Sequence, residues 1–211
     1  MNKFKLTMKA SHLRQLLAAH LVTASKDTTR PHLNCVAFAC KSPVVVELCS
    51  TNGHFLLRSS ITVDHCNAVE SEPVIMPAHI AKAFITTLKP WTEKADCVAE
   101  LSLVDSHWCL TTLTGVSTFA APSDDDDTRF TPYEQFIPNY HAEDGRACRA
   151  IGLDIDYMRA LDKAIVKDTS SKTSARPSRF SFGGELDPIR VDSEIPSMGL
   201  TQTFVLMPMR I

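Results

Sequence analysis

The sequence lacks any apolar run that is long enough for a membrane-spanning helix, which needs roughly 20 residues. It also lacks an excess of charge of either sign, because the formal net charge is −2. A chain with so little net charge has no general attraction to nucleic acid, so any DNA-facing surface has to be a local one. The first residues, Met1 to Lys5, lead into a strand-like pattern and not into a secretion signal.

Motifs of catalysis and of metal binding are missing as well. The sequence contains no phosphate-binding loop, no HExxH pair and no nucleophile elbow. The acidic run 124–127 lacks the alternating ligand spacing of a calcium loop, so a solvated linker is the better interpretation. His107 and Cys109 alternate onto one strand face, but no third group completes a thiol site. We therefore expect a protein that is not an enzyme and that uses no cofactor or metal.

Cysteine is more frequent, with seven residues, but none of them forms a CxxC pair. The cysteines lie in apolar segments that have the pattern of strands. This placement predicts buried free thiols in a reducing cytoplasm, and it argues against disulfides and against zinc. The positions are Cys35, Cys40, Cys49, Cys66, Cys97, Cys109 and Cys148.

The 211 residues, 44% of them hydrophobic, are enough for one to two globular domains. Their pattern repeats: a strand, a helix and three more strands follow one another three times, with a period of roughly seventy residues. Ser11 is a candidate N-cap for the first helix, and the other helices are expected at 77–88, with Pro77 at its start, and at 155–166. Strands are expected at 3–8, 34–39, 44–50 and 55–63 in the first copy, at 73–76, 97–104, 108–113 and 116–121 in the second, and at 148–153, 179–182, 186–192 and 203–207 in the third.

Two local signals stand out in this pattern. Asn52-Gly53 separates two strands and predicts a hairpin with a type I′ turn, because such a turn needs positive φ angles. Pro208 lacks the N–H that a central strand needs, so the last strand should stop there. Met207 and Met209 flank this proline and form an adaptable apolar surface. A plainer interpretation is a closing core strand with a frayed end.

Four short segments occur in the order in which one family has them. They are Arg30-Pro31-His32-Leu33, Ser50-Thr51-Asn52-Gly53-His54-Phe55-Leu56, Phe136-Ile137-Pro138-Asn139-Tyr140 and Val205-Leu206-Met207-Pro208-Met209-Arg210-Ile211. Together with the threefold repeat, they resemble the bacterial sliding clamp, the β subunit of the replicative DNA polymerase. The resemblance implies an α+β DNA-clamp fold with the helices on one face of antiparallel sheets. It also implies a clamp-like domain at 1–122 that resembles the middle clamp domain, a linker at 123–146, and half of a last clamp domain at 147–211.

The resemblance implies a groove that receives short linear peptide motifs. Apolar walls would bury the peptide, and a few polar groups would fix its orientation. Phe55, Ala142 and Glu143 depart from the family pattern and suggest a different peptide preference. The alternative is that His54 is an ordinary hairpin residue and that the methionines fill a core. The expected groove residues are Thr51, Gly53, His54, Leu56, Pro138, Val205, Met207, Pro208, Met209 and Arg210.

A second implied surface is basic and faces DNA. In the family the helices turn toward DNA and contact phosphates without reading bases. Acidic residues are nearly absent from the polar faces of the first two helices, which favours this interpretation over an ordinary solvated face. The third helix also carries Asp154, Asp156 and Asp162. The expected DNA-facing residues are Arg14, Lys26, Arg30, His32, Lys82, Arg159 and Lys163.

The function implied by the resemblance is that of a replication or repair processivity factor. It would encircle double-stranded DNA without sequence preference and dock a polymerase or clamp loader, in the cytoplasm at the nucleoid. The alternative is a truncated clamp that does not encircle DNA and that sequesters clamp-binding partners or a host clamp. We expect the third repeat to lack a partner within its own chain and to associate through its apolar face and strand edges. A ring of roughly a dozen repeats would need four chains, and a dimer of third repeats is the alternative.

Overall fold

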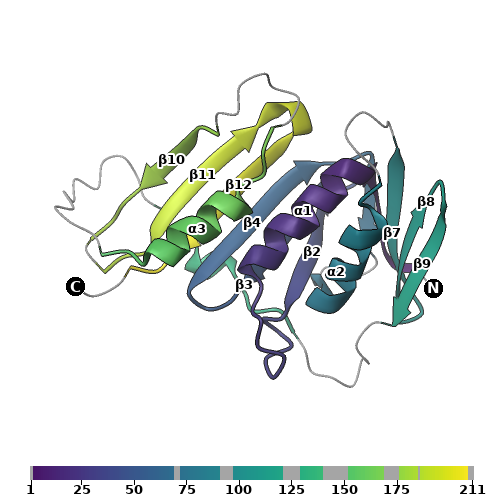
Figure 1. The fold of residues 1–211 in the computed structure, drawn as a ribbon, viewed down its shortest axis with the longest axis horizontal. Coiled ribbons are helices and arrows are strands. Elements are labelled where there is room, and N and C mark those ends of the chain that lie inside the picture. Colours follow the sequence, from purple (N-terminus) through teal and green to yellow (C-terminus); the bar gives the residue numbers. More distant parts are fainter. Residues whose placement is uncertain are drawn as a thin grey trace.

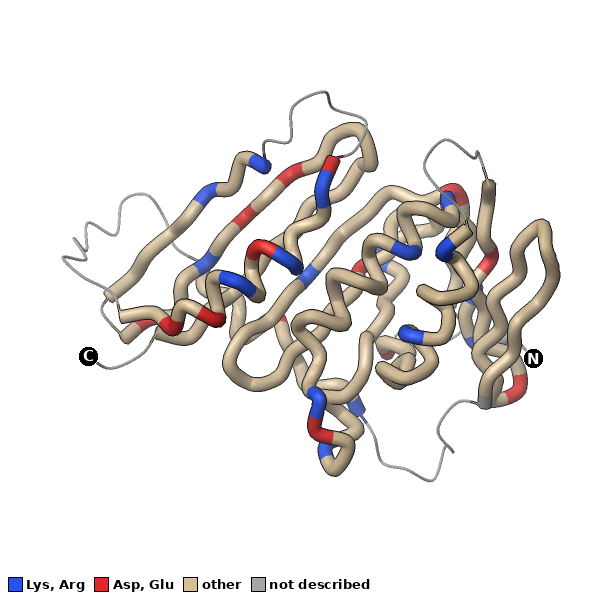
Figure 2. Tube along the Cα trace, viewed as in Figure 1, with Lys and Arg blue, Asp and Glu red and all other residues tan. Residues whose placement is uncertain are grey.

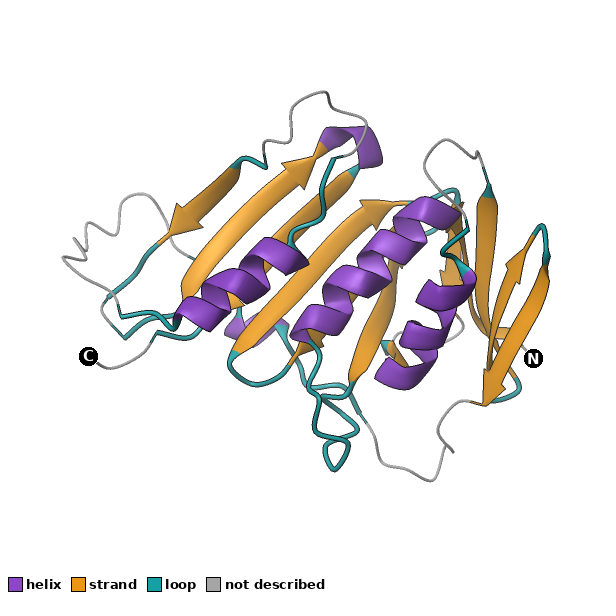
Figure 3. Cartoon of the chain, in the orientation of Figure 1, coloured by secondary structure: helices purple, strands orange, loops and turns teal. Residues whose placement is uncertain are grey.

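The computed structural model describes residues 2–68, 72–90, 97–120, 129–139, 152–168, 176–184 and 186–208. In these residues the chain forms two antiparallel sheets with helices on one side (Figures 1 and 3). The predicted α+β architecture is therefore confirmed. The helices are α1 (Ala10–Thr23), α2 (Ala78–Thr87) and α3 (Ile155–Ala164), with short 3-10 turns η1 (Glu134–Phe136) and η2 (Pro196–Met198).

The larger sheet has seven strands and the smaller sheet has five. In spatial order the larger sheet contains β10 (Ser178–Ser181), β11 (Ile189–Ile195), β12 (Leu200–Leu206), β4 (Phe55–Thr62), β3 (Val45–Thr51), β2 (Cys35–Ser42) and β6 (Val74–Pro77). The smaller sheet contains β5 (His65–Ala68), β1 (Asn2–Lys9), β7 (Val98–Val104), β8 (His107–Thr112) and β9 (Gly115–Ala120). All predicted strands that fall on described residues occur, whereas β5 was not predicted and residues 148–151 lie outside the description.

The first two repeats interlock by exchanging their first strands. β1 of the first repeat pairs with β7 of the second, and β6 of the second pairs with β2 of the first. The apolar stripe of α1 explains why the helix lies over these sheets, since Leu13, Leu16 and Leu17 are fully buried. α1 begins at Ala10 and has no side-chain cap, so the prediction of Ser11 as its N-cap is wrong.

The third repeat joins the first one in the same sheet. β12 pairs antiparallel with β4 from Leu200 opposite Ile61 to Leu206 opposite Phe55, and α3 lies beside α1 (Figure 1). The expectation that this repeat lacks a partner within its chain is therefore wrong, because β12 satisfies its edge on β4. The far strand, β10, has a neighbour on one side only among the described strands. The domain boundaries predicted near 122 and 147 fall outside the described residues and stay predictions.

A buried polar network lies under α1 at this junction. The ring of His20 is fully buried, with Nδ1 2.7 Å from Ser50 Oγ and Nε2 2.9 Å from Ser59 Oγ. Gln202 of β12 donates from Nε2 to the same Ser59 oxygen at 3.1 Å. Gln202 also accepts from the Val166 N–H beyond α3 at 2.8 Å. Helices and strands of both repeats are therefore connected through hydrogen-bonded side chains.

The turn chemistry differs from the expectation in one place. Among the described residues other than glycine, only Asp105 and Ser106 have positive φ, so the tight I′-like turn joins β7 to β8. In the predicted hairpin Gly53 has φ +90°, but Asn52 does not enter the left-handed region. The Asn52 side chain instead accepts the N–H groups of His54 and Phe55. The hairpin is present, and its assignment as type I′ is wrong.

The cysteine prediction needs a correction. Cys40 of β2 and Cys66 of β5 form a disulfide with a Cα–Cα distance of 6.1 Å, which lies within the usual range. The two residues belong to different sheets, so their spacing in the sequence gives no sign of this pairing. Free thiols are found at Cys35, Cys49, Cys97 and Cys109, and Cys148 lies outside the described residues.

In the described part of the chain, no helix is both long enough and apolar enough to cross a membrane.

The last strand ends at Leu206, two residues before Pro208, and the prediction that the ladder stops at this proline is confirmed.

We predict that His20 makes the stability of the fold depend on pH. Burial lowers the pKa of His20 to about 3, whereas an unfolded histidine has a pKa of about 6.5. The unfolded chain therefore binds the proton more readily, and the stabilisation is present above about pH 6.5 and is lost as the pH falls toward 3. Below pH 6.5 the free energy of unfolding should fall by about 1.4 kcal/mol per pH unit through this residue.

Denaturant unfolding between about pH 5 and 7 measures this effect, because most carboxylates stay ionised there. The variant His20→Gln should lose the slope, and the control His65→Gln, on the exposed side of β5, should keep it. Equal slopes in the wild type and in His20→Gln would show that the folded state does not hold this imidazole neutral.

Candidate functional site

An apolar cavity of about 220 Å³ lies where the β3–β4 turn meets the end of β12. It opens on the face of the larger sheet that points away from the helices, because Leu56 and Val205 alternate with the helix-facing Leu57 and Phe204. The lining residues are Leu33, Thr51, Gly53, His54, Phe55, Leu56, Thr131, Tyr133, Phe136, Val205 and Met207.

The turn is held rigidly by its own side chains. The Thr51 hydroxyl donates to the Phe55 carbonyl oxygen at 2.8 Å and accepts the Gly53 N–H at 3.1 Å. The Met207 N–H then donates to the His54 carbonyl oxygen at 3.0 Å. This last bond fastens the tail to the turn after the ladder has ended. The cavity rim is therefore preorganised on its backbone side.

Residues 129–139 cover part of the same sheet face. Tyr133 packs into a small buried cluster with Cys49, Leu56 and Val205, and Phe130 and Ile137 lie against its border. The predicted solvated linker is thus partly a wall of the cavity. The carbonyl oxygen of Pro138 accepts a hydrogen bond from Arg190 Nη1 at 3.1 Å, which ties the segment to β11.

A buried charge lies beneath this wall. Glu47 is buried and accepts a hydrogen bond from the Tyr133 hydroxyl. Lys41 Nζ lies 3.5 Å from one Glu47 oxygen, and Arg58 Nε lies 4.0 Å from the other. Burial and the hydrogen bond to Glu47 raise the pKa of Tyr133, so its hydroxyl stays a donor. Burial, together with the negative charge of Glu47, also raises the pKa of the Cys49 thiol.

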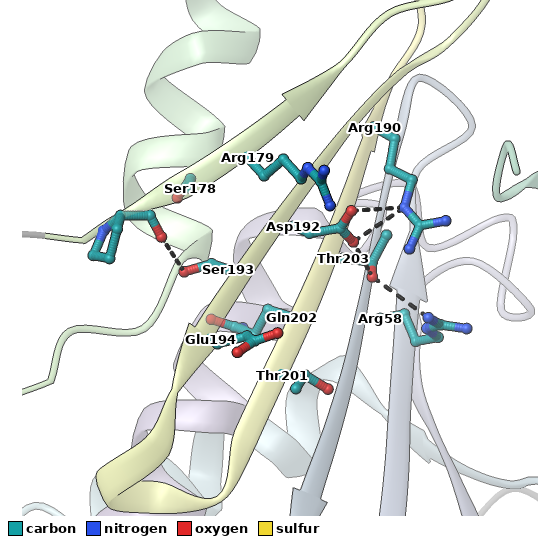
Figure 4. A pocket seen from close by; sticks show the side chains of 11 residues that line it. Arg58, Ser178, Arg179, Arg190, Asp192, Ser193, Glu194, Thr201, Gln202 and Thr203 are labelled. Carbon is teal, nitrogen blue, oxygen red and sulfur yellow. Dashed lines mark hydrogen bonds and ion pairs between the residues drawn. The ribbon is translucent and has the colours of Figure 1, made fainter. Parts of the chain in front are cut away.

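A wider polar hollow of about 640 Å³ lies on the same sheet face, beside the apolar cavity (Figure 4). Arg190 Nε donates to both oxygens of Asp192, at 2.8 and 3.1 Å, and Thr203 donates to Asp192 at 2.8 Å. Arg58 reaches Thr203 Oγ1 at 3.4 Å. Figure 4 shows Arg179 of β10 beside Asp192, its partner across the strands. Because acids and bases neutralise each other here, the hollow has polar walls but little net charge.

The structure brings together most of the predicted groove residues. Pro138 and Pro208 are half-buried and do not line the cavity, and Met209 and Arg210 lie outside the described residues, as do Ala142 and Glu143. Those that line the cavity are Thr51, Gly53, His54, Leu56, Val205 and Met207. The expected groove residues did not include the lining residues Leu33, Phe55, Thr131, Tyr133 and Phe136. For the last two, the aromatic spacing in 130–136 was the available signal.

The basic residues predicted to face DNA lie mostly on the helix side of the sheets. Figure 2 shows Lys and Arg along all three helices, whereas Asp occurs only on α3. Lys82 and Lys163 are exposed, and Arg14 is half-buried. Arg159 forms an ion pair with Asp156 at 2.6 Å, which reduces the positive charge it offers.

The remaining basic residues lie in the link between α1 and β2. Lys26 and Arg30 are exposed, and Arg30 lies 3.5 Å from the Asp27 carboxylate. His32 is half-buried, and its carbonyl oxygen accepts from the Cys35 thiol. In the described residues no group of His, Cys, Asp and Glu side chains could hold a metal ion.

The fold is similar to that of bacterial DNA polymerase sliding clamps. The clamp from Pseudomonas aeruginosa is 15% identical, with a TM-score of 0.75, over 100% of this chain and 68% of that chain. A clamp from the same organism bound to griselimycin is 16% identical, with a TM-score of 0.73, over 100% and 66%. The Bacillus subtilis clamp is 14% identical, with a TM-score of 0.70, over 98% and 64%.

These comparisons establish the sliding-clamp fold, and the chain spans about two thirds of the length of those clamps. No protein-family model matches the sequence, and no curated protein matches it.

We predict that the Tyr133 hydroxyl stabilises the wall of the cavity. Tyr133→Phe removes the hydrogen bond from the Tyr133 hydroxyl to the buried Glu47 carboxylate, which should lower the free energy of unfolding by about 1–3 kcal/mol. The control Tyr157→Phe removes the hydroxyl of a half-buried tyrosine in α3 and should change this free energy little. Denaturant unfolding at neutral pH measures both. A cost that persists undiminished when Tyr133→Phe is made in a Glu47→Gln background would contradict this role.

Proposed function

We propose that this protein is a non-enzymatic, clamp-like processivity factor that docks partners through short linear motifs and encircles DNA as an oligomer. The observation that carries the proposal is the apolar cavity between the Thr51–Leu56 turn and Met207. It lies on the sheet face opposite the helices, whose exposed side carries the basic residues (Figure 2). One face would therefore hold a peptide while the other faces DNA.

The cavity suits one large apolar side chain of an extended peptide. Its volume of about 220 Å³ and its mostly apolar walls favour a Leu or Phe, whose full burial contributes roughly 1.5–3 kcal/mol. The backbone of the turn and the His54 side chain supply polar groups at the rim. Such a site, on a surface of modest depth, should bind a Gln-Leu-x-Leu-Phe type peptide with an affinity on the order of micromolar. A DNA polymerase or a clamp loader would carry such a motif.

The helix face suits the phosphate backbone of double-stranded DNA. α1 and α2 contain bases and no acids, and their bases reach solvent. Phosphate contacts hold a protein on DNA without reading sequence, which sliding requires. A closed ring of roughly a dozen repeats would take four chains, since each chain supplies three.

A second candidate function is favoured by α3, where Asp156 pairs with Arg159 and makes the helix face less basic. In this alternative the protein does not encircle DNA, and it regulates replication by sequestering clamp-binding partners or a host clamp. Both functions use the cavity, and only the first requires the helix face and a ring. A ring would be retained on circular DNA and would slide off linear DNA, whereas a protein that sequesters partners would show no such difference. Comparing the two DNA substrates therefore separates the two functions.

We predict that the tail is part of the peptide site. Met207→Ala removes a lining side chain and should weaken a labelled Gln-Leu-x-Leu-Phe peptide roughly tenfold, or about 1.4 kcal/mol. Deleting 207–211 should abolish binding. Val116→Ala, an exposed apolar residue on β9, serves as the control and should bind as the wild type does. Fluorescence anisotropy gives the dissociation constants. Full affinity after the deletion would mean that the tail is merely a chain end.

We predict that reversing charge at Arg14, Lys82 and Arg159 weakens DNA association and leaves peptide binding intact. Each lost phosphate contact should flatten the log–log salt dependence by roughly 0.9. Arg159 should contribute less than the other two, because Asp156 already neutralises it. A titration of duplex DNA at several salt concentrations measures the slope.

The matched control is Arg179→Glu, an exposed arginine that lines the hollow on the opposite sheet face. Its salt slope should equal that of the wild type. If the triple variant also keeps the wild-type slope, DNA does not bind to the helix face.

A further inference from the structure

Among the described residues, the third repeat lacks the strand and helix neighbours that the first repeat has on its outer side. In both repeats a helix is followed by three antiparallel strands, so β10, β11 and β12 correspond to β2, β3 and β4. β2 is bordered on its far side by β6, which belongs to another repeat. β10 has no such second neighbour among the described strands.

The side chains of the two corresponding strands differ in the same way. Phe38 of β2 pairs with the core residue Leu48 and is 0% exposed. Its ring lies 5.7 Å from that of Trp108, which the second repeat supplies. Phe180 of β10 likewise pairs with a core residue, Val191, so it also points to the helix side. Yet Phe180 is 40% exposed.

Other large apolar side chains near this end of the sheet are exposed too. Phe182 stacks on Phe180, with ring centroids 6.4 Å apart, and is 48% exposed. Ile155 opens α3, and Leu186 lies in the link between β10 and β11; both are more than half exposed. Exposed apolar side chains beside an open strand edge are typical of an association site. We call Ile155, Phe180, Phe182 and Leu186 the open face.

The helices show the same contrast. α1 contacts α2 on one side and α3 on the other. α3 contacts α1, and no described helix lies against its other side (Figure 1). The first repeat is thus packed against the second, which has the same order of strands and helix.

We propose that the open face binds the open face of a second copy of this chain. The two third repeats would pack about a twofold axis, as the first and second repeats pack within one chain. A twofold contact uses the same patch on both copies, and it closes at two chains. The edge of β10 would receive an extended segment of the partner, in the way that β2 receives β6. This contact depends on the fold alone and on neither DNA nor peptide binding.

Sedimentation velocity over a micromolar concentration series tests the dimer. The molar mass of the wild type from sedimentation should be twice the 23.3 kDa chain mass or a higher multiple of it. Phe180→Ser combined with Phe182→Ser should raise the dissociation constant of the dimer at least tenfold. Leu113→Ser combined with Val116→Ser, exposed apolar residues on the other sheet, is the matched control and should leave the dimer intact. Circular dichroism and peptide binding check that both variants fold.

Hydrogen exchange on the wild-type protein gives a second measurement that needs no variant. The amides of β10 should exchange more slowly as the protein concentration rises, while those of β9 should not change. A monomer at every concentration, or a dimer that only the Leu113/Val116 variant disrupts, would overturn the inference. A dimer that binds neither DNA nor peptide would support it and would contradict the proposed function.

Discussion

The pairing of β4 with β12 is the contact on which the rest of the structure depends. It places the β3–β4 turn next to the chain end, so that Met207 can donate to the His54 carbonyl oxygen and close the rim of the cavity. It also sets Gln202 directly opposite Ser59, and the hydrogen bond between their side chains is buried. A slip of one residue would turn Val205 toward the helices and Phe204 outward. The same slip would leave Gln202 and Ser59 without their partners, which is costly for buried polar groups.

The period-two alternation of these strands separates two different surfaces. Along β4, Leu57 and Ile61 face the helices, while Leu56 and Arg58 face the opposite side. The helix-facing residues form the core that holds the three helices, and the other residues form the floor of the cavity and of the polar hollow. Because neighbouring residues of a strand point to opposite faces, one register fixes both the helix packing and the side chains that line the cavity. The basic helix face and the cavity therefore stay on opposite sides of one sheet.

Much of this arrangement could be predicted from the sequence, because it rests on local patterns. Helix stripes such as Leu13, Leu16 and Leu17, and the alternation of the strands, report which side chains a backbone segment can bury. The threefold order and the short segments at Thr51–Leu56 and Val205–Met207 carried the resemblance to the clamp family, and that resemblance implied the groove. The turn type was harder to predict. The Asn52 side chain accepts the N–H groups of His54 and Phe55, so the turn is stabilised without a positive φ angle at Asn52.

What could not be predicted depends on contacts between distant segments. The disulfide joins residues 26 positions apart in two different sheets, and no local pattern indicates that pairing. Tyr133 lies in a connection that is polar on average, and its ring is buried because it packs against Cys49, Leu56 and Val205 while Glu47 accepts from its hydroxyl. The attachment of the third repeat to β4 is also of this kind. A strand with an apolar face needs a neighbour, but its sequence does not say which edge of the fold will provide one.

Both outer strands of the larger sheet, β6 and β10, have a single neighbour among the described strands, but α2 packs beside β6, whereas no described helix lies beyond α3 at the β10 end. We call the β10 end the open end, and the fold limits how it can be covered. The first two repeats keep α1 and α2 on the same side of the molecule although they exchange strands. A twofold axis that related two third repeats in that way would likewise keep their helices on one side. The basic faces of two chains would then continue into each other, and the cavities would stay on the opposite side. A head-to-tail contact between unlike edges has no such requirement to close, and it can extend into open filaments. Coverage of the open end by a like repeat is thus the arrangement that is compatible both with the core and with a continuous helix face.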